Sequence, residues 1–354
     1  MAAYTTIDDP TAYFKVQIYN SSGADNNAIT FNDTDTTMQP DFIWIKTYDA
    51  GNQHALYDAV RGATKHLRSN DESVEGTDTD ALTTFGSNGF TVDADANGIG
   101  VNYGDENQVA WCWKANGSGS ANTAGSINTT ATSANTTSKF SIIHFTGNLT
   151  SGATIGHGLG AAPHLILTKS LDQANDWGAF HEYMHADPED YAMKLNTTAA
   201  RTNQFAMCND TAPSSTLITL GDEGRSNDDE EMIAYCWAPV QGYSKFGSYT
   251  GNGNADGQFV YLGFRPAWLT IWNADSAGSN KYVFDYKRAG YNIQNNRLDA
   301  NTSASQGTDV RLDFLSNGFK SRNTGNPNTA TLWIYAAFAE APFVNSSGVP
   351  CNAR

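Results

Sequence analysis

The sequence predicts an all-β protein made of three tandem antiparallel units, each a β-sandwich or jelly-roll-like fold. Three observations support this prediction. Short alternating runs rich in Ile, Val, Thr, Tyr, Phe and Trp are separated by clusters of Gly, Asn, Asp and Ser, as is typical between antiparallel strands. Convincing helical periodicity is nearly absent from the 354 residues. Three landmarks also recur in one order, which indicates one kind of unit repeated three times.

The landmarks define each expected unit from its first strand to its last. The first is an alternating strand that opens with phenylalanine and runs into a Gly/Asn turn. The second is a proline followed by an apolar run, and the third is an apolar run that ends in an aromatic residue. In chain order the three copies are Phe14–Tyr19, Phe140–Phe145 and Phe246–Tyr249; Pro40–Lys46, Pro163–Lys169 and Pro266–Trp272; and Val109–Trp113, Ile233–Trp237 and Ile334–Phe338.

These landmarks give the expected domain organisation. Residues Asn116–Ser138 are almost wholly Gly, Ser, Ala, Asn and Thr, a composition that predicts a flexible linker. The segment before the first landmark is expected to be a docking arm that is free to extend. The prediction is therefore an arm at 1–12, a first unit at 13–115, the linker at 116–138, a second unit at 139–240, a third at 241–345 and a tail at 346–354.

Composition and charge exclude several classes of function. The formal net charge is −16, which argues against a general nucleic-acid binder and against docking on an anionic membrane surface. No stretch approaches the roughly 20 apolar residues of a membrane span. The first ten residues contain neither a basic region nor an apolar one, so no signal peptide is evident.

Asp93, Asp95 and Asn97 match the front of a calcium loop, with oxygen ligands at alternate positions and Gly98 at the bend. The twelfth position is Gly104, so the usual bidentate glutamate is missing. These residues are the metal-site candidates of the sequence. The favoured interpretation is nevertheless an Asp/Asn-rich turn between strands, and no cofactor is expected.

His181, Glu182 and His185 match the zinc motif H-E-x-x-H. That chemistry needs a helix, which places both histidines on one face as zinc ligands and leaves the glutamate to activate water. The preceding residues alternate as in a strand, and on a strand the two histidines would lie about 13 Å apart. A zinc hydrolase is therefore only a remote alternative, and we expect no enzyme.

Trp111 and Trp113 are expected to share one face of the closing strand, with Cys112 on the other. Burial against a second sheet is favoured over an exposed platform for sugars, because large aromatic side chains dominate cores. Cys112 and Cys236 are interpreted as small core residues. The roles of Cys208 and Cys351 stay open.

Several phrases of the chain resemble repeated units in structural proteins of marine tailed phages. The phrases are Gln39–Lys46, Val109–Gly117, Gly152–Gly160, Lys194–Ala199, Ala336–Phe343 and the ending Asn352–Arg354. One departure is Asn345–Cys351, where that family runs shorter and more basic. The resemblance implies a virion surface protein without catalysis and carries no defined binding site.

The function expected from the sequence is a non-enzymatic virion protein displayed on the particle surface, as a tail fibre, an appendage or a capsid decoration. Its expected partners are other virion proteins of the capsid or tail, a second copy of the chain, and a host-surface glycan. The alternative is a carbohydrate-binding, lectin-like adhesin. The oligomeric state, the receptor and the unit that anchors the protein stay open.

Overall fold

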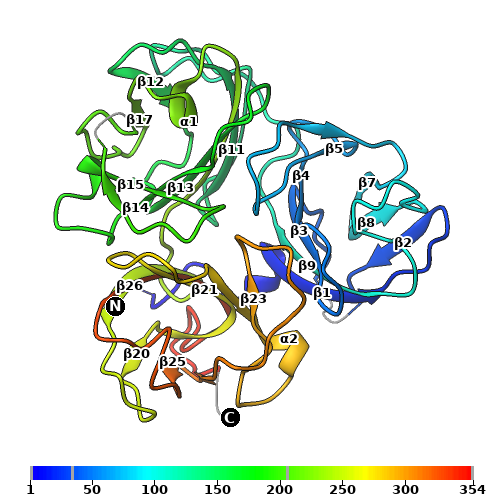
Figure 1. Cartoon of the computed structure of the whole chain (residues 1–354), viewed down its shortest axis with the longest axis vertical. Helices are drawn as coiled ribbons and strands as arrows, with labels where there is room; N and C mark the ends of the chain where they lie inside the picture. The colour runs from blue at the N-terminus through cyan, green and yellow to red at the C-terminus, as the bar shows by residue number, and fades with distance from the viewer. Residues whose placement is uncertain (1–2, 33–35, 205–206, 352–354) are drawn as a thin grey trace.

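The structure is a computed structural model that describes residues 3–32, 36–204 and 207–351. It consists of antiparallel sheets and confirms the prediction of an all-β fold. Figure 1 shows three lobes around a common centre, which we call lobe 1 (residues 14–113), lobe 2 (residues 116–237) and lobe 3 (residues 244–342). The helical elements in the described residues are single turns: η1 (Pro10–Ala12), η2 (Pro188–Asp190), α1 (Gly224–Asn227) and α2 (Tyr286–Ala289). In this part of the chain no helix is long and apolar enough to span a membrane.

Lobe 1 contains a principal sheet with the strand order β1-β9-β3-β4 and a second sheet with the order β2-β8-β7. A two-stranded ribbon, β5-β6, extends it. The strands are β1 (Phe14–Asn20), β2 (Asn27–Thr30), β3 (Phe42–Thr47), β4 (Ala55–Asp58), β5 (Lys65–His66), β6 (Gly76–Thr77), β7 (Leu82–Gly86), β8 (Gly89–Val92) and β9 (Asn107–Trp113).

Lobe 2 has a longer principal sheet with the order β10-β11-β18-β13-β14-β15-β16, and a second sheet formed by β12 and β17. Its strands are β10 (Ala131–Asn135), β11 (Phe140–Thr146), β12 (Ala153–Gly156), β13 (Leu165–Ser170), β14 (Gly178–His181), β15 (Tyr191–Lys194), β16 (Thr202–Asn203), β17 (Leu217–Leu220) and β18 (Glu231–Trp237).

Lobe 3 has a principal sheet with the order β19-β26-β21-β22-β23 and a second sheet with the order β20-β25-β24. Its strands are β19 (Ser244–Thr250), β20 (Phe259–Tyr261), β21 (Phe264–Asn273), β22 (Tyr282–Asp285), β23 (Leu298–Asp299), β24 (Leu312–Leu315), β25 (Gly318–Ser321) and β26 (Leu332–Pro342).

Four strands of each principal sheet are connected in the same order, and the register follows the sequence landmarks. In each lobe the closing aromatic residue lies opposite the second residue after the landmark proline. The three pairs are Trp113 with Phe42, Trp237 with Leu165, and Phe338 with Trp268. Homology between the lobes and the exact unit boundaries stay predictions of the sequence.

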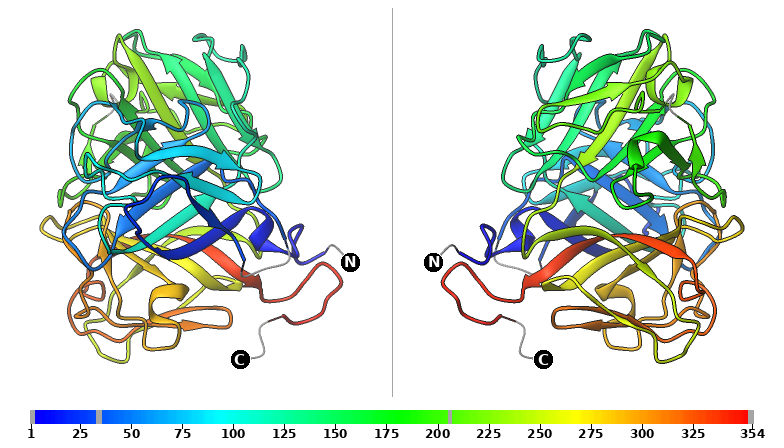
Figure 2. Two further views of the ribbon diagram at one scale, coloured as in Figure 1. Left: turned by 90° about the vertical axis from the view of Figure 1, so that its right-hand side faces the viewer. Right: turned by 90° about the vertical axis from the view of Figure 1, so that its left-hand side faces the viewer.

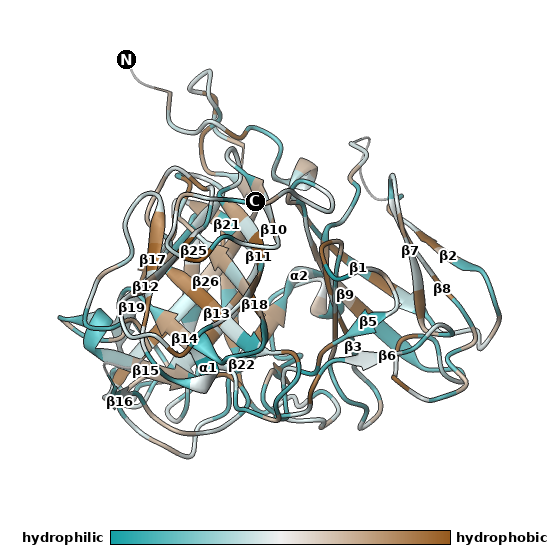
Figure 3. Cartoon of the chain, turned by 90° about the horizontal axis from the view of Figure 1, so that it is seen from above, coloured by the Kyte–Doolittle hydropathy of each residue, from teal (hydrophilic) through white to brown (hydrophobic). Residues whose placement is uncertain are grey.

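Each principal sheet is buried on both faces, which explains why all six residues of β3 are buried. Ile43 and Cys112 face the core inside lobe 1, whereas Phe42 and Trp113 belong to a core shared by all three lobes. Figure 3 shows hydrophobic colour on strands of the principal sheets, such as β26 and β13, and also on β17 and β2 of the second sheets. The expected burial of Trp111 and Trp113 is confirmed, but the neighbouring lobes cover them and not a second sheet of lobe 1. Trp113 lies 6.1 Å from Trp237 of lobe 2 and 5.5 Å from Trp268 of lobe 3, measured between ring centroids.

The segment 116–138 is not the flexible linker that its composition predicts. Its strand β10 pairs with β11 and becomes the edge of the principal sheet of lobe 2. Ile127 is buried in the shared core, and the hydroxyl of Ser133 accepts the backbone N–H of Asn116. A few well-placed contacts are therefore enough to fix a segment of small polar residues.

The N-terminal segment does not extend freely but packs on lobe 3 from Tyr4 onward. The hydroxyl of Tyr4 donates to the carbonyl of Gly263, and Thr5 and Ile7 are buried. The backbone N–H of Ser346 donates to Asp8, so this segment also contacts the C-terminal segment. Figure 2 shows both ends of the chain on the same side of the molecule. Residues 1–2 and 352–354 lie outside the described residues.

Candidate functional site

The calcium-loop candidates are used to close a turn. The buried carboxylate of Asp95 accepts the backbone N–H groups of four residues, Ile99, Gly100, Val101 and Asn102, over 2.7 to 3.1 Å. Asp93 accepts the N–H of Asn26, and the amide of Asn97 donates to Asp78. Within the described residues, no group of three His, Cys, Asp or Glu side chains has the arrangement of a metal site. Asp93, Asp95 and Asn97 therefore stabilise the loop, because amide hydrogens occupy the positions that a cation would need.

The histidine motif lies on a strand and a turn. His181 is the last residue of β14, and its Nδ1 accepts the N–H of Tyr183. Its Nε2 therefore carries the hydrogen and donates to the carbonyl of Tyr335 in lobe 3. His185 accepts the N–H of Asp187, and the centroid of its ring lies 4.0 Å from the centroid of the Tyr191 ring. The two histidines make separate contacts and do not form the helical face that the zinc hydrolase alternative requires.

Burial also explains the unusual state of His181. Its side chain is 2% exposed, and burial lowers its pKa to about 4, with a smaller contribution from nearby His164. A histidine that stays neutral at physiological pH can keep one nitrogen as an acceptor and the other as a donor. In this fold His181 lies between lobes 2 and 3 and forms a hydrogen bond that joins them.

The four cysteines are free thiols. Cys112, Cys208 and Cys236 are buried, and burial raises the pKa of Cys208 to about 12. Such thiols are unreactive at neutral pH. Cys351 is exposed and borders a hollow of about 750 Å³ that also contains Tyr291 and the Arg265–Glu340 ion pair.

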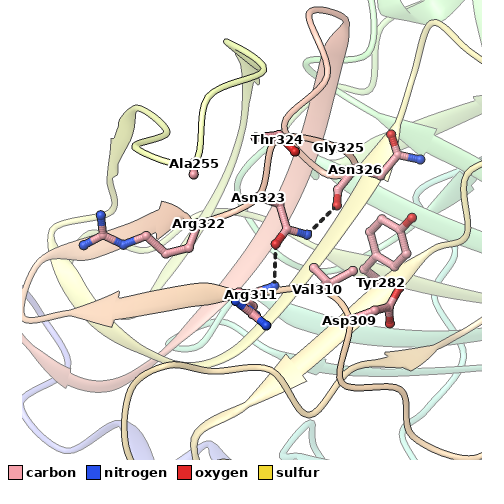
Figure 4. A pocket seen from close by; sticks show the side chains of 10 residues that line it. All are labelled: Ala255, Tyr282, Asp309, Val310, Arg311, Arg322, Asn323, Thr324, Gly325 and Asn326. Carbon is pink, nitrogen blue, oxygen red and sulfur yellow. Dashed lines mark hydrogen bonds between the residues drawn. The ribbon is translucent and has the colours of Figure 1, made fainter.

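A polar hollow with a volume of about 550 Å³ lies on lobe 3 (Figure 4). It is formed where the segment before β24 meets the segment after β25. The hairpin brings these together, and the N–H of Arg322 donates to the carbonyl of Arg311 over 2.9 Å. The lining residues are Ala255, Tyr282, Asp309, Val310, Arg311, Arg322, Asn323, Thr324, Gly325 and Asn326.

The charged side chains of this pocket differ in their partners. Arg322 binds the carboxylates of Asp313 and Asp256, and Asp309 is held by Arg297. Arg311 is exposed, and its guanidinium makes no ion pair or hydrogen bond within the described part of the chain. The pocket of an acidic protein thus presents one cation that is available to an anionic ligand.

Amide groups complete the pocket around Arg311. The side-chain oxygen of Asn323 accepts the N–H of Arg311, and its nitrogen donates to the carbonyl of Asn326, as Figure 4 shows. These bonds fix the loop 322–326 across the backbone of Arg311. A guanidinium beside amide and hydroxyl groups matches a ligand that carries a carboxylate and several hydroxyls.

Sequence reasoning did not single out this pocket. A pocket depends on which loops a hairpin brings together, and here β24 and β25 do so. Arg311 carries no motif, and the only available signal was a basic residue in an Asn- and Gly-rich region of an acidic chain.

Comparison with protein families gives one result. Residues 9–342 match the model of a family described as Domain of unknown function (DUF7483). Neither the curated proteins nor the solved structures give a match.

Proposed function

This chain belongs to the family Domain of unknown function (DUF7483), and we propose that it is a non-enzymatic structural protein displayed on the surface of a phage virion. The observation that carries the proposal is the locking of three lobes into one body around a shared core. At each contact between lobes, a side chain of one lobe forms a hydrogen bond with a side chain or a backbone carbonyl of the neighbouring lobe. Such a body suits a protein that must survive outside the cell and present loops.

The two ends of the chain support one mode of attachment. Both lie on the same side, where Asp8 contacts Ser346. A body held through this side would display lobes 1 and 2 outward. The partner in the particle would be a capsid or tail protein, and the sequence resemblance to phage structural proteins supports the same reading.

Immunoelectron microscopy of purified particles tests this function. Antibodies raised against the purified chain should label intact virions, and mass spectrometry should find the chain in particles purified through a density gradient. A non-structural protein made during the same infection serves as the control for contamination. Absence of the chain from particles, with abundant chain in the lysate, would overturn the proposal.

A second candidate function is the binding of an acidic glycan, and the lobe 3 pocket favours it. The unpaired guanidinium of Arg311 would bind a sugar carboxylate, and the loop 322–326 would bind hydroxyls. A glycan array probed with and without calcium tests this function. Binding of uronic- or sialic-acid glycans should be lost in Arg311→Ala and retained in Lys114→Ala, a control that lies just after lobe 1, away from the pocket. Equal binding by both variants would exclude the pocket.

A further inference from the structure

The contacts between lobes, which we call seams, contain buried bases in an uneven distribution. The side chains that cross the two seams of lobe 3 include His54 of lobe 1, His181 of lobe 2 and Lys281 of lobe 3. Each hydrogen bond ends on a backbone carbonyl of the other lobe. These three residues are at most 2% exposed.

His54 lies at the seam between lobes 1 and 3. Its Nδ1 accepts the indole N–H of Trp44 over 2.8 Å, so its Nε2 carries the hydrogen and donates to the carbonyl of Asp299 over 3.0 Å. The charged groups that face it are Lys46 of lobe 1 and Arg288 of lobe 3, and the Asp299 carboxylate is itself bound by Arg297. Burial lowers the pKa of His54 well below its usual value, and both cations act in the same direction.

His181 lies at the seam between lobes 2 and 3 and makes the same pair of bonds. It accepts from Tyr183 and donates to the carbonyl of Tyr335 over 3.0 Å. The neighbouring titratable groups are His164 and Tyr183 of lobe 2, and Tyr335 and the ring of Phe246 face it from lobe 3. No carboxylate contacts the ring within the described residues, so a proton on His181 would be uncompensated.

Lys281 lies in the same seam, 3.2 Å from the carbonyl of Ala199 and 5.6 Å from the ring centroid of Trp272. Burial lowers its pKa to about 7. The Arg201–Asp275 ion pair also crosses this seam, near the surface, and its two charges neutralise each other. Lys281 therefore adds a further base whose charged form is disfavoured when lobe 3 is docked.

The seam between lobes 1 and 2 is built differently. Its buried charges are already paired, since Asp58 binds Arg61 over 2.5 Å and accepts the hydroxyl of Tyr235 over 2.7 Å. The indole N–H of Trp177 donates to the carbonyl of Arg68. Burial lowers the pKa of Lys169 in lobe 2 to about 8, and the facing carboxylates of Asp71 and Glu72 in lobe 1 partly offset that effect. No histidine side chain bridges this seam in the described residues.

From this distribution we infer that the fold contains an acid-sensitive hinge: mild acid opens both seams of lobe 3 while lobes 1 and 2 stay joined. A proton on His54 or His181 removes the acceptor that Trp44 or Tyr183 uses and leaves a charge in an apolar seam. The N-terminal segment bonds to lobe 3 through the hydroxyl of Tyr4, a group that stays neutral in acid. Lobe 3 therefore swings open but remains tethered.

Linkage gives the direction and the expected size of the effect. In the closed form the histidine is neutral, whereas in the open form it regains its ordinary pKa and is protonated at pH 5. For His181, with a pKa of about 4 when closed, the opening equilibrium should rise roughly 30-fold between pH 7.5 and pH 5. His54 acts in the same direction at the other seam.

Backbone amides that cross the seams provide direct probes. Arg201 and Gly278 donate to carbonyls across the seam between lobes 2 and 3, and Gln306 donates across the seam between lobes 1 and 3. Glu75 donates across the seam between lobes 1 and 2. Hydrogen exchange of the full chain is measured at pH 7.5 and 5.0 and corrected for the intrinsic chemical rate. The first three amides should exchange at least about tenfold faster at pH 5, and Glu75 should not.

The double variant His54→Gln/His181→Gln keeps a donor at each carbonyl and cannot be protonated at these positions, so it should lose most of the acceleration, and only the part that Lys281 contributes should remain. His185→Gln, which removes a histidine whose hydrogen bond stays within lobe 2, should behave like the wild type. Equal acceleration at Glu75 and at the other three amides would overturn the inference, as would an undiminished acceleration in the double variant. If the double variant does not fold at pH 7.5, the wild-type comparison of the four amides decides the question alone.

Discussion

Asp58 of lobe 1 and His181 of lobe 2 occupy the same position in their principal sheets. Asp58 lies opposite Phe42 and His181 lies opposite Leu165, and each of these partners follows a landmark proline by two residues. Both side chains point into a seam, where Asp58 meets Tyr235 and His181 meets the carbonyl of Tyr335. One position of the sheet thus joins neighbouring lobes with two different chemistries.

The contact at Asp58 predicts the effect of Tyr235→Phe. The variant keeps the ring and removes the hydroxyl that donates to the buried Asp58 carboxylate. We expect the free energy of unfolding to fall by about 1–3 kcal/mol, as for other buried hydrogen bonds to charged groups. Urea denaturation measures it, with Tyr183→Phe at a more exposed position as the control. An unchanged midpoint in Tyr235→Phe would show that the hydroxyl does not stabilise the seam.

The Asp285–Arg288 pair of lobe 3 predicts a larger effect. Both side chains are fully buried, the pair spans 2.6 Å, and Asp285 also accepts the indole N–H of Trp111 from lobe 1. Arg288→Leu leaves an uncompensated carboxylate and should cost about 3–5 kcal/mol. Lys287→Leu, one residue earlier and partly exposed, should cost far less. Similar midpoints for both variants would argue against a stabilising role of the pair.

Lys281 predicts a pH dependence in the alkaline range. Its pKa is about 7 in the folded chain and near its ordinary value when unfolded. The unfolded chain therefore binds more protons between these values, and stability should rise with pH above 7, by at most about 1.4 kcal/mol per pH unit. Lys281→Met should be more stable than the wild type at pH 7, and the difference should shrink toward pH 10. Unfolding at several pH values measures this, and parallel curves would contradict it.

The packing of Ile127 predicts that the segment 116–138 contributes to stability. Ile127→Ala should lower the free energy of unfolding by about 2–5 kcal/mol, because it creates a cavity in the shared core. Ala121→Ser, at an exposed position six residues earlier, is the matched control. A mobile linker would tolerate both changes equally, so equal thermal midpoints would contradict the folded state of this segment.

Local sequence pattern identified the strands but not their surroundings. Alternation around Phe14 and the run after Pro40 predicted strands that the structure confirms, because short-range pattern reports which residues are buried. Pattern does not say which body buries them, so Trp111 and Trp113 were assigned to a second sheet although other lobes cover them. The same limit applied to residues 116–138, where composition alone suggested mobility.

The candidate sites were less predictable than the fold. Asp95 was a calcium candidate because carboxylates at alternate positions suit calcium, but the favoured interpretation was a turn. Backbone amides four to seven residues later use its oxygens, as that interpretation expects. Arg311 was not singled out, since its availability depends on Arg322 and Asp309 finding other partners. Function in such a chain depends on which charges remain unpaired after folding, and spacing along the sequence does not reveal this.

The burial of each principal sheet on both faces determines which substitutions the protein can tolerate. The side chains that point toward the centre or into a lobe make up the hydrophobic cores, whereas Thr324 and Gly325 of the pocket loop are exposed. A substitution at Trp113 should therefore be felt by three lobes at once, whereas substitutions at these two loop positions should leave the interior unchanged.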